Sequence, residues 1–104
     1  MVTIVETGKG AAFAYESITV STAAIGFTLA TLRPTTGREA ASAFVTSEDD
    51  VIRWRMDGTD PTTTEGHVLA VDSQLLIEGI NNIRSFRAIR DAGTDVVLKV
   101  TYTR

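Results

Sequence analysis

Short runs in which every second side chain is apolar recur along the chain, and this pattern is the strongest constraint on its fold. The clearest run is the last, residues 96–103, whose apolar positions are Val96, Leu98, Val100 and Tyr102. Successive side chains of a β-strand point to opposite faces of a sheet, so a period of two places this apolar set on one face. The last run is therefore predicted to be a half-buried strand.

The same alternation predicts other strands. Two clear ones are Ile52–Met56 and Ile25–Ala30, and weaker candidates are Ala41–Thr46, Ser73–Glu78 and Arg84–Arg90. A further run, Phe13–Val20, begins with its apolar residues in one phase and ends with them in the other. Such a switch indicates a β-bulge or a strand that crosses between sheets. Five side chains on these apolar phases are expected in the core: Phe27, Trp54, Leu98, Val100 and Tyr102.

Turn residues separate the predicted strands. Asp91–Asp95 and Arg33–Gly37 combine glycine with proline or aspartate, as turns prefer, and Glu78–Asn82 is a third break. Leu76, Ile80, Ile83 and Arg87 also match a helical spacing, so a single helical turn near residue 80 is the alternative there. Strands at this spacing predict one domain over residues 1–104, an all-β sandwich of about seven or eight strands. Immunoglobulin-like and jelly-roll-like arrangements both remain open.

Composition excludes several classes of protein. The chain has 104 residues, no cysteine and a net charge of −3. It can form neither disulfides nor thiolate metal sites, and its mild acidity argues against nucleic-acid binding. No apolar stretch approaches the length that spans a bilayer, and Met1–Glu6 lacks the layout of a signal peptide. We therefore expect a protein made in the cytoplasm that binds neither membranes nor nucleic acid.

The most distinctive segment is the loop from Asp57 to Gly66. Asp57, Asp60 and Glu65 carry the hard oxygen atoms that calcium prefers, but their spacing does not match an EF-hand. Gly58 and Pro61 are typical of a tight turn instead. We expect hydrogen bonds within the loop, and neither a metal nor another cofactor, to order it. The acidic run Glu48–Asp50 is similarly interpreted as a solvated turn.

Arginine is used in preference to lysine, with eight arginines and two lysines in the chain. The planar guanidinium suits protein interfaces better than the compact ammonium of lysine. Arg53 and Arg55 project from one face of a predicted strand. The single histidine, His67, has no cysteine or serine motif that would make it part of a catalytic set. We predict no catalytic residues, and the candidates for partner binding are Arg53, Arg55, Asp57, Asp60 and His67.

Four segments carry a resemblance to known families. They are Ile52–Thr62, which ends in Asp-Gly-Thr-Asp-Pro-Thr, the pair Gly66-His67, Ile83–Ile89 and Val100-Thr101-Tyr102. The first segment is similar to an element of immunoglobulin-like or fibronectin-like modules in bacterial surface and glycan-processing proteins. Over nearly the whole chain, the set resembles small virion proteins of tailed bacteriophages. That family implies no catalytic residues.

The resemblance implies a non-enzymatic structural protein of the virion that binds other virion proteins of the capsid or tail. Capsid decoration is the first expectation, and a neck, collar or tail accessory role is the alternative. A homo-oligomer or another multi-copy assembly is expected in either case. A carbohydrate-binding or adhesion module is the rival class, and a chain that begins at Met1 without a signal peptide argues against it.

Overall fold

The computed structural model describes residues 10–104, so the prediction for Met1–Glu6 lies outside the described residues. Within that range the chain is mostly β-structure. The strands are β1 (Ala12–Val20), β2 (Ser42–Ser47), β3 (Ile52–Arg55), β4 (His67–Leu69), β5 (Gln74–Glu78), β6 (Arg87–Arg90) and β7 (Val96–Thr103). The helices are α1 (Leu29–Leu32) and α2 (Ile80–Ser85). Neither of these two short helices could cross a membrane.

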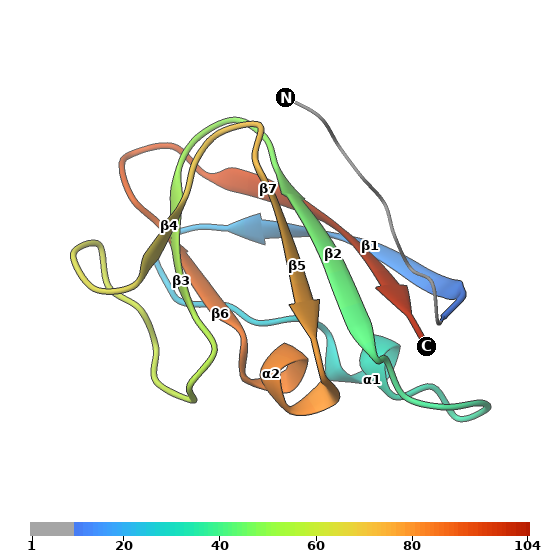
Figure 1. Ribbon diagram of the computed structural model, residues 1–104. Helices are drawn as coiled ribbons and strands as arrows, with labels where there is room; N and C mark the ends of the chain where they lie inside the picture. The colour runs from blue at the N-terminus through green and yellow to red at the C-terminus, as the bar shows by residue number, and fades with distance from the viewer. Residues whose placement is uncertain (1–9) are drawn as a thin grey trace.

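The strands form two antiparallel sheets, and the predicted β-sandwich is confirmed. One sheet has the order β1-β7-β2-β5, and the other has the order β4-β3-β6. Figure 1 shows them facing one another, with α1 and α2 at the lower end. The larger sheet is called the large sheet below, and the three-stranded one the small sheet.

The pairing is nested about the β3–β4 connection. β3 pairs with β4, β2 pairs with β5, and β1 pairs with β7. Between the last two pairs lies an isolated bridge from Ile25 to Ala88 of β6. A long antiparallel hairpin rolled up in this way is a jelly roll, here with its second strand reduced to one bridge. The immunoglobulin arrangement differs, because it separates the first and last strands between its two sheets.

The core lies between the sheets. β7 contributes most to it, because Val96, Leu98, Val100 and Tyr102 are all fully buried, as the alternation predicts. Phe27 is also buried and stacks on Phe86 with ring centroids 4.5 Å apart. Trp54 was expected to be buried as well, but it is only partly so, because β3 ends one residue later at the rim of the small sheet.

Two strand predictions need correction. Ile25–Ala30 is not a strand: Ile25 forms the single bridge to Ala88, and the chain then turns into α1. Of Arg84–Arg90, only Arg87–Arg90 is a strand, since the first part belongs to α2. The helical alternative near residue 80 is therefore the correct one. Strand β4 was not predicted, because three residues are too few to show a period of two.

The bulge predicted in Phe13–Val20 is confirmed. Ala12 lies opposite Thr103 and Ala14 lies opposite Tyr102, so Phe13 is the extra residue in β1. Beyond it, Ile18 and Val20 face the core. Phe13 lies beneath the guanidinium of Arg104, which is 4.5 Å from the ring centroid. Tyr15 also lies beyond the bulge but points outward, so Tyr15 and the pair Ile18 and Val20 occupy opposite faces of the regular part of β1.

Candidate interaction face

Three arginines share the outer face of the small sheet. Arg55 of β3 lies directly opposite Arg87 of β6, and Arg53 lies on the same side of β3. Ile52 and Trp54 occupy the opposite, inward face, as their alternation predicts. Like charges placed directly across a strand pair repel one another. The Arg55–Arg87 pair therefore needs negative charge nearby.

The loop between β3 and β4 supplies this negative charge. Asp57 accepts hydrogen bonds from Arg55 at 3.0 and 2.5 Å, and Asp60 accepts one from Arg87 at 3.0 Å. Arg53 bonds instead to Asp91 at 3.0 Å and to the backbone oxygen of Gly66 at 3.2 Å. Each arginine of this face is thus paired with an aspartate, and the face is close to neutral.

The loop is also held by its own hydrogen bonds. The hydroxyl of Thr62 accepts bonds from the amides of Thr64 and Glu65, at 3.3 and 3.0 Å. The amide of Thr62 in turn donates to the oxygen of Glu65 at 2.9 Å. Gly66 has a φ of +137°, and a Cβ atom there would lie 3.1 Å from both Pro61 and the oxygen of Trp54. A side chain at this position would be strained by the backbone conformation and crowded against Pro61 and β3.

The charge state of the Arg55–Asp57 pair follows from its geometry. The hydrogen bonds from Arg55, helped by the amide of Thr59, lower the pKa of Asp57 to about 2. The same contact raises the pKa of Arg55. Both groups are therefore charged across the whole neutral range of pH.

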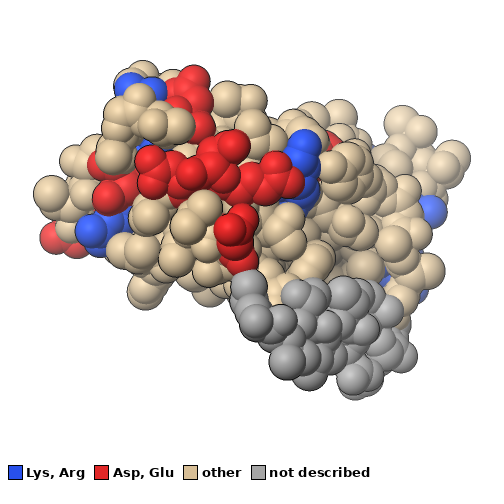
Figure 2. Space-filling view, turned by 90° about the horizontal axis from the view of Figure 1, so that it is seen from above, with Lys and Arg blue, Asp and Glu red and all other residues tan. Residues whose placement is uncertain are grey.

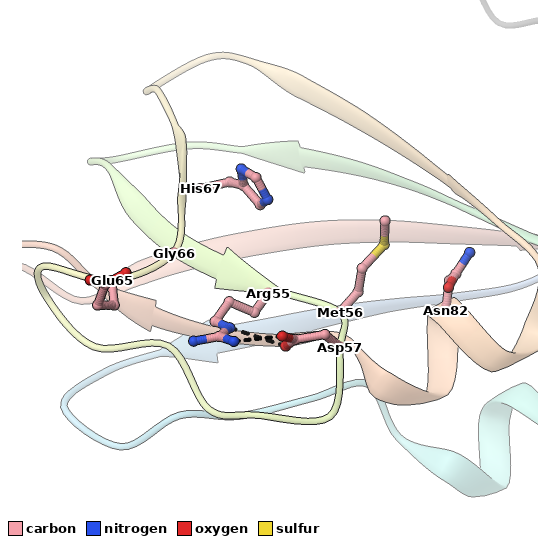
Figure 3. Close-up of a pocket in the computed structure, with 7 residues that line it drawn as sticks. All are labelled: Arg55, Met56, Asp57, Glu65, Gly66, His67 and Asn82. Atoms are coloured by element: carbon pink, nitrogen blue, oxygen red, sulfur yellow. Dashed lines mark hydrogen bonds and ion pairs between the residues drawn. The ribbon is translucent and has the colours of Figure 1, made fainter.

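A hollow of about 580 Å³ lies where this loop meets α2. Its walls are formed by Arg55, Met56, Asp57, Glu65, Gly66, His67 and Asn82. Figure 3 shows His67 on one side, facing Met56 and Asn82, with the Arg55–Asp57 pair on the other. The ring of His67 lies 4.8 Å from that of Trp54. The hollow thus combines charged walls with an aromatic pair at its edge.

The structure brings four of the five predicted site residues together on the outer side of the small sheet, while His67, which lies opposite Trp54, has its side chain on the inner side. Arg55, Asp57 and His67 line the hollow, while Arg53 and Asp60 lie on the adjoining face. We call this region, the outer face of the small sheet with the loop 56–66, the interaction face. Sequence reasoning missed Arg87, Asp91 and Asn82 as members. Only the strand register and the approach of α2 place these residues here, and no local pattern shows either.

Acidic side chains gather at the other end of the sandwich. Figure 2 shows them as a row when the molecule is seen from above. The turn Glu48–Asp50 joins β2 to β3 here, as predicted, and the carboxylate of Asp49 accepts a bond from the amide of Val97. Asp95 accepts bonds from Ser21 and Arg90, which lower its pKa. Across residues 10–104, no cluster of acidic and histidine side chains has an arrangement that could hold a metal ion.

Comparison of the chain with protein-family models, curated protein sequences and solved structures finds no match.

Proposed function

We propose that this protein is a non-enzymatic binding protein that attaches to other proteins of a bacteriophage particle. Capsid decoration is the first candidate role, and a neck, collar or tail accessory role is the second. The observation that carries the proposal is the interaction face, where the candidate residues Arg53, Arg55, Asp57 and Asp60 lie together, with His67 on the wall of the adjoining hollow. The resemblance to small virion proteins of tailed phages supplies the kind of partner.

Preorganisation supports binding at this face. Ion pairs and backbone hydrogen bonds already hold the loop 56–66, so little conformational entropy remains to be lost when a partner docks. Arginine is also enriched among the residues that contribute most to protein interfaces. A partner can displace the exposed aspartates and pair with the arginines itself. Alternatively, it can bind the three Arg–Asp ion pairs without separating them.

The chemistry of the hollow favours binding over proton transfer. An efficient general base has a pKa near the working pH, whereas the pKa of Asp57 is about 2. Its two oxygens are also occupied by Arg55. A carboxylate held in this way positions its neighbours and accepts protons poorly.

The first experiment asks whether the protein is part of a particle. We expect quantitative mass spectrometry of purified phage particles to find the chain in many copies per particle. Its absence from particles that are otherwise complete would overturn the proposal. A glycan array run on the purified protein tests the rival class, and strong binding of a sugar together with absence from particles would establish that rival.

The second experiment tests the face itself. The double variant Arg53→Ala, Arg55→Ala removes two of its three arginines, and Arg33→Ala, Arg84→Ala removes the same charge elsewhere. The ion pairs of Arg53 and Arg55 are only partly exposed and contribute modestly to folding, so both variants should remain fully folded at the temperature of the binding assay. Truncating a central interface arginine costs about tenfold or more in affinity, so only the first variant should lose occupancy on particles. Equal occupancy for the two variants would remove this face from the proposal.

A further inference from the structure

The outer face of the large sheet carries a row of three large apolar side chains and one threonine. Tyr15 lies opposite Thr101, Thr101 lies opposite Phe44, and Phe44 lies opposite Leu76. Directly opposed residues of antiparallel strands share a face. Because Val100 and Tyr102 point into the core, this row points away from it. We call Tyr15, Thr101, Phe44 and Leu76 the outer row.

The outer row is open to solvent. Tyr15 is 60% exposed and Leu76 is 51% exposed, and they lie on the two edge strands, with Phe44 partly exposed between them. The four strands are about 4.8 Å apart, so the row crosses about 14 Å of the sheet surface. Tyrosine and phenylalanine are enriched at protein interfaces. Contiguous apolar surface of this kind commonly marks a contact with another protein.

Two charges flank the row on opposite sides. Lys99 lies one register step to one side, opposite Ser17 and Thr46, and Glu78 lies one step to the other side, opposite Ser42. The two residues are about 14 Å apart along the strands and about 10 Å apart across them, too far to pair within one molecule. Among the ion pairs of residues 10–104, none includes either residue.

We infer that the outer face of the large sheet binds a second copy of this chain through a two-fold axis that runs along the outer row. Such an axis places the two rows against each other. It also moves Lys99 of each copy to the side that holds Glu78 of the other, where an offset of about 10 Å across the strands is within the combined reach of the two extended side chains. In a symmetric dimer both copies use the same surface, so the charges of that surface must complement one another after the two-fold rotation.

The size of the face indicates the strength of the dimer. Four strands, up to eight residues long in β7, give about 500 Å² per copy, or about 1,000 Å² in total. This area is at the lower end for specific interfaces, so a dissociation constant in the micromolar range is expected. The dimer does not involve the interaction face on the small sheet. Self-association and particle binding can therefore fail separately.

The test is sedimentation of the full chain over about 5–500 µM. We expect a reversible monomer–dimer equilibrium. Leu76→Asp should raise its dissociation constant at least about tenfold, because the dimer would bury the new carboxylate without a partner. Val68→Asp is the matched control: Val68 is 53% exposed on the small sheet, and its change should leave the dimer intact. A natural chain that stays monomeric throughout would overturn the inference. So would a Leu76→Asp protein that dimerises as tightly as the natural chain.

Charge reversal tests the axis. Lys99→Glu and Glu78→Lys, each alone, place like charges against each other and should weaken the dimer about threefold or more. The double variant exchanges the two charges and should restore the dissociation constant to within about twofold. This rescue distinguishes a second copy from an unrelated partner, for which exchanging the charges restores nothing. A dimer whose dissociation constant is unchanged in all three variants would overturn the two-fold arrangement.

Discussion

Tyr102 is fully buried, and its hydroxyl group reaches a carboxylate at the rim of the core. The hydroxyl donates to Glu16 at 2.5 Å, and Thr28 donates to the other oxygen of the same carboxylate at 2.7 Å. Tyr102→Phe keeps the ring but removes one donor from a charged acceptor. We expect the free energy of unfolding in urea to fall by about 1–3 kcal/mol at neutral pH. A loss within measurement error would mean that water replaces the hydroxyl at no cost.

The same residue makes stability depend on alkaline pH. Burial, and then the hydrogen bond to Glu16, raise the pKa of Tyr102 above its usual value. An unfolded tyrosine loses its proton near pH 10, whereas the folded protein retains it to higher pH. Above about pH 10 the unfolded state therefore binds fewer protons, and stability falls as pH rises. Melting temperatures from pH 8 to pH 11 should decline less steeply in Tyr102→Phe, and equal slopes would contradict this account.

For Asp57 we expect the opposite dependence of stability on pH, with the loss at acidic pH. Its pKa is about 2 because Arg55 donates to it, so its contribution to stability is present above pH 4 and is lost as pH falls towards 2. Carboxyl-carbon NMR should show a midpoint near pH 2 that Arg55→Gln raises towards the ordinary value near 4. Arg53→Gln is the control, because Arg53 pairs with Asp91. A midpoint that Arg55→Gln leaves in place would show that this ion pair does not form in solution.

At the scale of elements, the loop between β3 and β4 depends on two glycines for different reasons. Gly66 has positive φ and little room for a Cβ atom, whereas Gly58 has positive φ in open space. Gly58→Ala should cost about 1–2 kcal/mol for the backbone conformation alone. Gly66→Ala should cost more, because the loop must also move away from β3.

The matched control for these changes is Gly93→Ala, where φ is not in the left-handed region and no atom lies within 4 Å of an added Cβ. In urea unfolding, Gly66→Ala should lose the most stability, Gly58→Ala should lose less, and Gly93→Ala should lose the least. A Gly66→Ala protein as stable as Gly58→Ala would mean that the loop adapts without cost. It would then be less rigid than the proposed binding role requires.

For the whole molecule, the nested strand order determines how it should fold. The first strand pairs with the last, and both sheets contribute to one core, so neither sheet is complete without the other. We expect a single cooperative transition, with folding on a time scale of milliseconds to seconds because most contacts are distant in sequence. Trp54 reports on the small sheet, and circular dichroism reports on both sheets. Unfolding curves from the two probes should coincide, and separated midpoints would show that the sheets unfold independently.

The candidate site was only partly visible in the sequence. Arg53, Arg55 and the loop residues Asp57 and Asp60 stand out because they lie close together along the chain. The ion pairs of Asp60 and Arg53 could not be predicted, because their partners Arg87 and Asp91 are 27 and 38 residues away. The outer row is similarly hidden, since Tyr15, Phe44 and Leu76 come from three strands that only the register aligns.

Alternation by itself determined the all-β class and the buried face of β7, because a period of two is a local property of an extended backbone. It left a bulge and a crossing between sheets both open for β1, and only the register of β1 against β7 decided for the bulge. The tertiary structure alone decided that Ile25–Ala30 is not a strand, that β4 exists and that the fold is a jelly roll. Ile25 reaches Ala88, and His67 pairs with Trp54, only once β3 and β6 are in place. Such contacts depend on where distant segments lie, and local pattern carries no information about that position.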